Sequence, residues 1–129
     1  MSNKFTVEII TPDQSILKSE TNEVTIPSYE GQMGILKDHI PLITFLRPGL
    51  IVLKNEKEKK FYVEEGTVEF SNNNLLILTS TVRDVEKLDS GLINLLIEEA
   101  EKKLKDNNLT DKEKYIVSYK VDTLKEINL

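Results

Sequence analysis

The chain has 129 residues, a net charge of −5 at neutral pH and no cysteine. A chain of this length forms one domain of ordinary size, with a core that needs no covalent cross-links. The composition excludes disulfides and thiolate metal sites, and the negative charge disfavours nucleic acid as a partner. The opening MSNKFTVEII lacks the pattern of a signal peptide, and no apolar run reaches the ~20 residues of a membrane-spanning helix. We therefore expect contact with a membrane only through a partner complex.

Residues 1–86 have the alternating pattern of β-strands. In the run KFTVEII, Phe5, Val7 and Ile9 point to one side while the residues between them point to the other. Turn signals rich in Pro, Gly, Asn or charge separate this run from six others, which are EVTIP, PLITFLR, GLIVLK, FYVEE, TVEFS and LLILTS. Many short strands without helices between them predict a β-sandwich or flattened barrel.

Residues 87–129 have the pattern of two helices. Asp89 is the expected N-cap of the first helix, and the run 106–108 (Asp-Asn-Asn) is expected to end it. Thr110 and Glu113 match a capping box, which opens a second helix that extends to about Ile127. The short connection predicts an antiparallel α-helical hairpin after the sandwich.

The predicted hairpin has only a modest apolar core of its own. Three acid–base pairs at i,i+4 spacing support the first helix, and they are Glu98–Lys102, Glu99–Lys103 and Glu101–Lys105. Helices of four to five turns are marginal in isolation, so packing against the rest of the chain must hold them. Two interpretations follow: a static appendage, or a loosely held moving part.

Residues 29–49, YEGQMGILKDHIPLITFLRPG, contain three of the five glycines, two of the four prolines and the only histidine. His39 is a candidate general base, pH sensor or contact residue, and the structural alternative is a residue that caps a turn. Gly31 and Gly34 form G-x-x-G without the further residues of a nucleotide loop, so they serve equally well as turn or packing residues. No nucleophile or metal motif accompanies them, and the residues alone indicate a binding module.

The stretch IPSYEGQMGILKDHIPLITFLRPGLIVL resembles the signature segment of the epsilon-subunit family of bacterial F-type ATP synthases. The matching positions are Glu30, Gly31, Gly34, Ile35, Leu36, His39, Pro41, Leu42, Pro48 and Gly49. A second segment, FYVEEGTVEFSNNNLLILTSTVRDVEKLD, is similar to that family's strand pair, asparagine turn and apolar strand. The resemblance covers essentially the whole chain, including the order of strands and then two helices.

This resemblance implies a β-sandwich of about ten strands followed by an antiparallel helical hairpin. It implies a rotor-binding domain over residues 1–86 and a regulatory hairpin over residues 87–129. The chain is expected to be a non-catalytic central-stalk subunit that couples the gamma subunit to the c-ring, without metal or other cofactor. Its expected location is peripheral, on the cytoplasmic face of the bacterial inner membrane.

The resemblance also implies which residues touch the rotor. The loop at Glu30, Gly31 and Gln32 is expected to face the c-ring, and His39 to lie at the contact with the rotor. Met33 is expected to belong to an exposed apolar surface that binds gamma. Gln32 stands where the family often has a carboxylate, so we expect a neutral hydrogen-bonding contact there.

In the family, the hairpin either folds against the sandwich or extends along gamma and inhibits ATP hydrolysis. The extended form is expected to bring lysines of the second helix to acidic groups of the catalytic alpha and beta subunits; these are Lys112, Lys114, Lys120 and Lys125. Some members bind ATP in the folded hairpin through a motif of which Asp89 remains here. Leu92 stands at its arginine position and no arginine follows Arg83, so ATP binding of that kind is not expected.

Two other functions fit the residues without the resemblance. One is a non-catalytic protein-binding adaptor module with a β-sandwich and a helical tail. The other is an enzyme that uses His39 with a carboxylate, which requires a concave pocket beside the imidazole.

Overall fold

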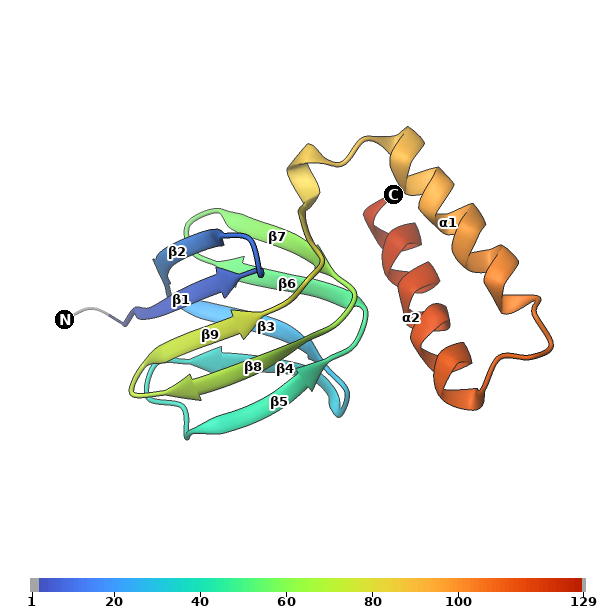
Figure 1. Ribbon diagram of the computed structural model, residues 1–129. Coiled ribbons are helices and arrows are strands. Elements are labelled where there is room, and N and C mark those ends of the chain that lie inside the picture. Colours follow the sequence, from blue (N-terminus) through green and yellow to red (C-terminus); the bar gives the residue numbers. More distant parts are fainter. Residues whose placement is uncertain (1–2, 129) are drawn as a thin grey trace.

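The computed structural model describes residues 3–128 and contains a strand-rich unit followed by two helices (Figure 1). The strands are β1 (Phe5–Ile10), β2 (Ser15–Thr21), β3 (Glu23–Ser28), β4 (Gly31–Leu36), β5 (Leu42–Leu46), β6 (Gly49–Lys54), β7 (Glu58–Val63), β8 (Gly66–Ser71), β9 (Asn74–Leu78) and β10 (Val82–Asp84). A 3-10 turn, Val85–Lys87, leads to helices α1 (Ser90–Leu104) and α2 (Asp111–Ile127). The expected sandwich with a C-terminal helical hairpin is confirmed.

The ten strands form one continuous sheet that curls into two layers. One layer has the order β10-β7-β6-β3-β4, and the other has the order β5-β8-β9-β1-β2. The layers join where β3 meets β5, through the single pair Ser28 and Leu46. The strand pairs are antiparallel except β1 with β9, which run parallel.

Three strands were not among the runs expected from the sequence: β2, β4 and β10. β2 is an edge strand whose side chains are mostly exposed, so polar residues interrupt its apolar pattern. β4 contains the G-x-x-G residues Gly31 and Gly34, which indicate a turn more strongly than a strand. β10 has only three residues and lies at the other edge of the sheet.

The core lies between the two layers and is built from alternate residues of their strands. The rings of Phe5 and Phe70 meet edge to face, with centroids 5.6 Å apart. Around them lie buried aliphatic side chains of both layers, among them Val7, Ile9, Val24, Ile26, Ile35, Leu46, Ile51, Leu53, Val68, Leu75 and Ile77. The period-two pattern of the sequence therefore assigns the inner face of most strands correctly.

Gly49 is expected to be intolerant of any side chain, because a Cβ there would collide with the ring of Pro27. We expect Gly49→Ala to lower the free energy of unfolding by about 1–3 kcal/mol, the usual cost of overpacking. Gly34→Ala is the matched control, since a Cβ at Gly34 has no neighbouring atom within 4 Å. Urea unfolding followed by circular dichroism measures both, and equal stability of the two variants would contradict the expectation.

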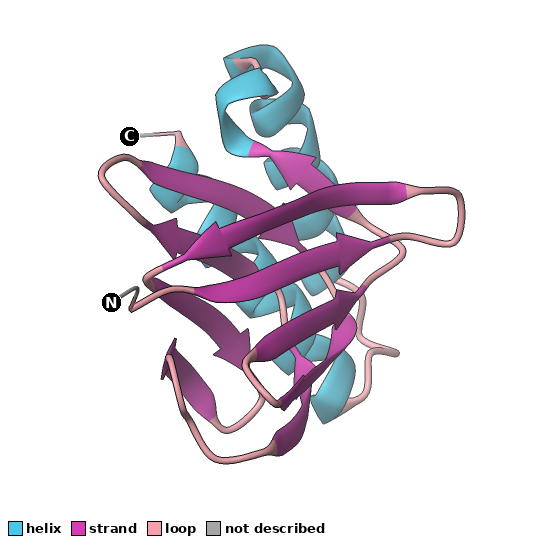
Figure 2. Cartoon of the chain, turned by 90° about the vertical axis from the view of Figure 1, so that its left-hand side faces the viewer, coloured by secondary structure: helices cyan, strands magenta, loops and turns pink. Residues whose placement is uncertain are grey.

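The hairpin packs against β6 and β7, and Figure 2 shows both helices behind the strands. The expected caps are confirmed: the Asp89 carboxylate accepts the Leu92 N–H at 2.7 Å, and Thr110 and Glu113 form a complete capping box. None of the three expected i,i+4 pairs of α1 is an ion pair within residues 3–128. Glu101 instead pairs with Lys125 of α2 at 3.4 Å, because the two helices lie side by side.

Candidate protein-binding surface

The outer face of the layer β5-β8-β9-β1 carries apolar side chains that no other element within residues 3–128 covers. Strand register places Phe45, Thr67, Leu78 and Ile10 in one row across the four strands. The next row contains Ile43, Glu69, Leu76 and Glu8. We call the apolar members the partner face, and they are Ile10, Ile43, Phe45, Leu76 and Leu78.

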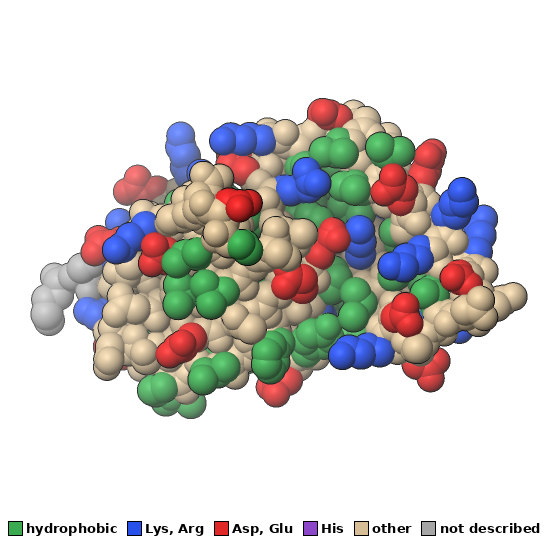
Figure 3. Space-filling model, in the orientation of Figure 1, with side chains coloured by type: hydrophobic (Ala, Val, Ile, Leu, Met, Phe, Trp, Pro, Cys, Tyr) green, Lys and Arg blue, Asp and Glu red, His purple; other side chains and the backbone are tan. Residues whose placement is uncertain are grey.

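The partner face is unusually exposed for its composition. Ile43 is 75% exposed, Phe45 60% and Leu78 44%. Figure 3 shows hydrophobic side chains gathered over these strands, with acidic side chains between them. Contiguous exposed apolar patches on soluble proteins commonly mark surfaces that bind another macromolecule.

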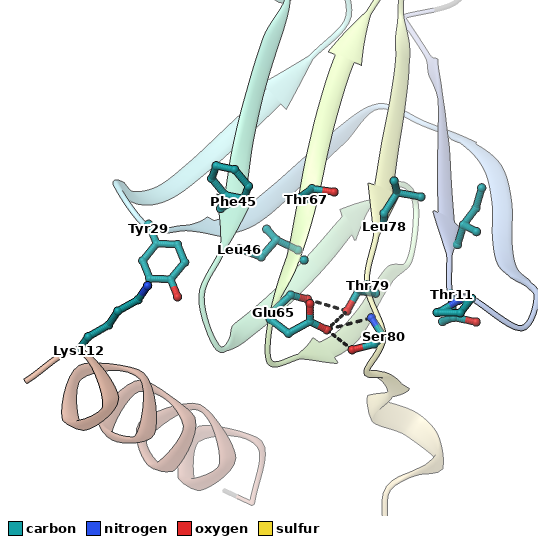
Figure 4. A pocket seen from close by; sticks show the side chains of 13 residues that line it. Thr11, Tyr29, Phe45, Leu46, Glu65, Thr67, Leu78, Thr79, Ser80 and Lys112 are labelled. Atoms are coloured by element: carbon teal, nitrogen blue, oxygen red, sulfur yellow. Dashed lines mark hydrogen bonds between the residues drawn. The ribbon is translucent and has the colours of Figure 1, made fainter. Parts of the chain in front are cut away.

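The partner face continues into a pocket of about 940 Å³ at the edge where β8 begins and β9 ends (Figure 4). Phe45, Leu46 and Leu78 supply apolar lining, and Tyr29 stands at the side nearest the hairpin. Lys112 extends from α2 toward Tyr29, so the pocket is formed jointly by the sandwich and the hairpin. Because apolar and polar residues line the pocket together, it suits a ligand or partner side chain that has both an apolar and a polar part.

A fixed carboxylate lies on the polar side of this pocket. Glu65 accepts hydrogen bonds from the Ser80 backbone N–H at 2.9 Å, from the Ser80 hydroxyl and from the Thr79 hydroxyl at 3.3 Å. Burial alone would raise the pKa of Glu65, but these hydrogen bonds outweigh it and lower that pKa. The pocket therefore keeps a negative charge opposite Lys112.

Glu65 and its neighbour Glu64 were expected to lie adjacent on a strand, and this is wrong. Strand β7 ends at Val63, so both residues belong to the β7–β8 turn. Glu64 turns toward the hairpin and pairs with Lys120 at 3.1 Å, while Glu65 turns toward the pocket.

Four of the five predicted contact residues of the 29–49 segment lie in the β3–β4 turn and the first half of β4, and the fifth, His39, lies beyond the end of that strand. Glu30 lies exposed in the β3–β4 turn, where its N–H donates to the Ser28 hydroxyl at 3.1 Å. Gly31 has a φ of 127°, a conformation that favours glycine. Gln32 is exposed and lines a small cleft beside Arg47 and α2.

Met33 and His39 lie differently from what the sequence suggested. Met33 is only half-exposed and packs against the sandwich core, so the exposed apolar surface is built from Ile43 and Phe45 instead. His39 lies past the far end of β4, roughly 20 Å along the six-residue strand from the Glu30 turn. The structure therefore does not bring the five predicted residues into one site.

His39 has the contacts of a turn residue. Its N–H donates to the Leu36 carbonyl at 3.1 Å, its Nδ1 lies 2.7 Å from the Ile40 carbonyl, and its ring meets Phe70 edge to face. Neighbouring Asp38 has a φ of 66° and is fixed by two hydrogen bonds with Asn73. These contacts match the capping alternative for His39.

The lysines predicted for the regulatory hairpin fall into two groups. Lys112 and Lys114 are exposed in the first turn of α2. Lys120 and Lys125 are already paired, with Glu64 and Glu101 respectively. Any movement of the hairpin that offers Lys120 to another partner must first break its contact with the sandwich.

Within residues 3–128, no three His, Asp or Glu side chains are grouped so that they could hold a metal ion. Neither described helix has the length and apolar character needed to cross a bilayer.

Sequence comparison identifies the family. Residues 4–85 match the model of the β-sandwich domain of the ATP synthase delta/epsilon chain. The chain belongs to this family. The ATP synthase epsilon chain of Pelagibacter ubique is 45% identical over 130 residues, which cover 99% of this chain and all of that relative. The epsilon chain of Desulfitobacterium hafniense strain Y51 is 36% identical over 105 residues, 81% of this chain and 80% of that one.

Solved structures share the fold. A chain of the Euglena gracilis mitochondrial ATP synthase (OSCP/F1/c-ring) superposes with a TM-score of 0.80 at 21% identity, covering 98% of this chain and 82% of that one. A chain of the Tetrahymena thermophila mitochondrial ATP synthase (central stalk/c-ring) gives 0.69 at 17% identity, with 96% of each chain covered. At such identities the likeness extends to the fold, with both the sandwich and the helices included.

Proposed function

We propose that this chain is the epsilon-type subunit of the central stalk of an F-type ATP synthase, without catalytic activity of its own. The observation that carries the proposal is the partner face, which leaves Ile43 and Phe45 exposed in a member of the delta/epsilon family. A typical stable interface buries about 800 Å² on each partner and needs apolar anchors near its centre. We assign the gamma subunit to this face and residues 1–86 to the rotor-binding domain.

The β3–β4 turn is the proposed contact with the c-ring. Glu30 and Gln32 are both exposed there, and positive φ at Gly31 fixes the shape of the turn. Glu30 offers a carboxylate, whereas Gln32 offers an amide that donates and accepts without charge. The chain would thus turn with the rotor, held by its face on gamma and by this turn on the ring.

The hairpin, residues 87–129, is the proposed regulatory domain. Lys112 and Lys114 are available for acidic groups of the catalytic alpha and beta subunits when the hairpin extends, and Lys120 and Lys125 become available once their present ion pairs break. The exposed pair of Lys125 with Glu101 contributes only about 0–1 kcal/mol and is readily exchanged, whereas the pair of Lys120 with Glu64 is half-buried. The extended hairpin would inhibit ATP hydrolysis.

We assign neither a nucleotide nor another cofactor to the hairpin. Asp89 is engaged in capping α1, and Leu92 offers no cation for a phosphate. The proposed location is the cytoplasmic face of the bacterial inner membrane, reached through the assembled synthase.

A binding experiment tests the assignment. The full chain is mixed with the gamma subunit of the Pelagibacter ubique synthase, whose epsilon chain is 45% identical, and then with gamma bound to its c-ring. Co-elution in size-exclusion chromatography at micromolar concentration is expected in both cases. Failure to bind either assembly contradicts the stalk assignment and favours an adaptor for some other protein.

Removal of the hairpin tests its regulatory role. A chain that ends after Asp89 lacks both helices and all four of the hairpin lysines named above. In a synthase assembled with it, steady-state ATP hydrolysis is expected to rise by about fivefold or more, the lower range of coupling between protein sites. Co-purification with gamma is the control for assembly. Unchanged hydrolysis by an assembled complex would contradict inhibition by the hairpin.

A further inference from the structure

Besides the ion pair of Lys120 with Glu64, the hairpin touches the sandwich at two places that differ in chemistry. The first is apolar and joins Leu124 of α2 and Ile93 of α1 to Tyr62 of β7. The second is aromatic and cationic, and it joins Tyr115 and Tyr119 of α2 to the β3–β4 and β5–β6 turns. The two contacts lie about 13 Å apart along α2, at 1.5 Å per residue between positions 115 and 124.

The apolar contact has a built-in weakness. The Tyr62 hydroxyl is buried, and within residues 3–128 no group meets it with full hydrogen-bond geometry, although the Glu64 carboxylate lies near it. An unsatisfied buried hydroxyl costs about 1–3 kcal/mol. Burial, together with the charge of Glu64, raises the pKa of Tyr62 further above its usual value, so the hydroxyl remains a neutral donor. The apolar contact alone therefore holds the hairpin less firmly than its area suggests.

The aromatic contact is centred on Arg47. Its Nη1 donates to the Tyr115 hydroxyl at 3.0 Å, and its guanidinium lies 4.0 Å from the centre of the Tyr119 ring. Tyr115 and Tyr119 are four residues apart on α2, so they share one face and meet edge to face at 4.8 Å. One guanidinium thus makes a hydrogen bond and a cation–π contact to the same helix face.

The sandwich holds its half of this contact rigidly. The Arg47 N–H donates to the Pro27 carbonyl at 2.9 Å, and Pro48 follows at once with its fixed φ. Tyr29 is held by its N–H bond to the Phe45 carbonyl at 3.1 Å, and its ring stacks on Tyr115 at 6.1 Å. The backbone of both turn residues is therefore fixed by the sandwich itself, while the Arg47 guanidinium makes its contacts with α2.

We propose that Arg47 and Tyr29 form the sandwich half of a latch that holds α2 in its docked position through Tyr115 and Tyr119. Arg47 is thereby the residue that sets the balance between the docked and the released hairpin. This regulatory role rests on the proposed function, but the latch itself is a property of the isolated chain. Tyr29 also lines the pocket beside Phe45, so the latch adjoins the partner face.

Arg47→Met tests the latch, because it keeps an unbranched apolar chain and removes the guanidinium. The hydrogen exchange rates of amides in α2 are measured by mass spectrometry in the full chain, with those of the sandwich core as internal reference. We expect exchange in α2 to become about tenfold faster, the ratio for roughly 1.4 kcal/mol, while exchange in β1 and β9 stays unchanged. Lys18→Met is the matched control, since it removes a cation from an exposed position on the edge strand β2, away from the hairpin.

A second variant removes less of the latch. Tyr115→Phe deletes only the hydroxyl, which accepts from Arg47 and donates to the Tyr29 carbonyl, and we expect a smaller acceleration in the same region. The proposal is overturned if exchange in α2 is the same in Arg47→Met as in the parent or in Lys18→Met. It is also overturned if β1 and β9 accelerate equally, since Arg47 would then support the sandwich as a whole. The proposed function has its own test: it is contradicted if the parent chain does not bind gamma, whatever the exchange rates of α2 are.

Discussion

Replacement of Phe45 by alanine is expected to weaken binding of the gamma subunit by about 30-fold or more. Phe45 is 60% exposed and stands at the junction of the partner face and the pocket, where an aromatic side chain acts as an anchor. Truncation of such an anchor typically costs about 2 kcal/mol or more of binding energy. Isothermal titration of the full chain with gamma measures the change in Kd.

The control for this variant is Leu95→Ala on α1. Leu95 is also an exposed apolar residue, 51% accessible, but it belongs to the hairpin and lies outside the partner face. Leu95→Ala is expected to leave the Kd for gamma within about twofold of the parent value, because surface substitutions outside an interface usually have small effects. If the two variants bind equally well, the partner face does not contain the gamma site. Since Phe45 points away from the core, its loss is expected to change the stability of the sandwich little.

Replacement of Leu124 by alanine is expected to release the hairpin while the sandwich stays folded. Leu124 is fully buried between Tyr62 and Ile93, and truncation of a buried leucine costs about 2–5 kcal/mol. The core of the sandwich is a separate cluster of side chains, so it does not share this loss. Trypsin cleavage at the hairpin lysines is expected to become about 30-fold faster or more, because cleavage tracks the population of the opened form.

The exposed Leu95 again supplies a matched control, since Leu95→Ala makes the same chemical change on the hairpin without opening a cavity. Its cleavage rate is expected to stay within about twofold of the parent. Equal rates for Leu124→Ala and Leu95→Ala would mean that packing at Tyr62 does not hold the hairpin. Far-UV circular dichroism and intact β-strand peptides would verify that the sandwich remains folded.

The sequence patterns identified the strands other than β2, β4 and β10, because alternation of Val, Ile and Phe with polar residues is a strong signal of a strand. They failed at β2 and β4 for opposite reasons. β2 is an edge strand whose exposed polar residues carry little pattern, and β4 contains glycines that suggest a turn. The helix caps were predicted correctly because Asp89 and Thr110 act on their own neighbours in sequence.

The partner face was missed although its residues lay in three runs that were expected to be strands, β1, β5 and β9. In PLITFLR, the inward set contains Leu42 and Leu46, and the outward set contains Ile43 and Phe45. Both sets are apolar, so alternation gives no sign of which side faces solvent. Met33 was expected to be exposed because β4 was not recognised as a strand. Its pairing with β3 places Met33 against the core.

The latch was beyond the reach of local patterns for a different reason. Its members, Tyr29, Arg47 and Tyr115, are distant in sequence, and the bond from Tyr115 to Tyr29 spans 86 positions. Nothing in the spacing of tyrosines on α2 distinguishes a contact with the sandwich from packing within the hairpin. Only the docked position of the hairpin brings these side chains together.

The parallel pairing of β1 with β9 has a consequence for the order in which the chain folds. Residues 6–10 of β1 need residues 74–78 of β9 beside them, so the layer that bears the partner face cannot close during synthesis before Leu78 has emerged. Such non-local pairings are slow to form because a long loop must close first. The helices emerge last from the ribosome and meet a surface that is already complete. The sandwich can therefore mature as a unit before the hairpin takes up its place on it.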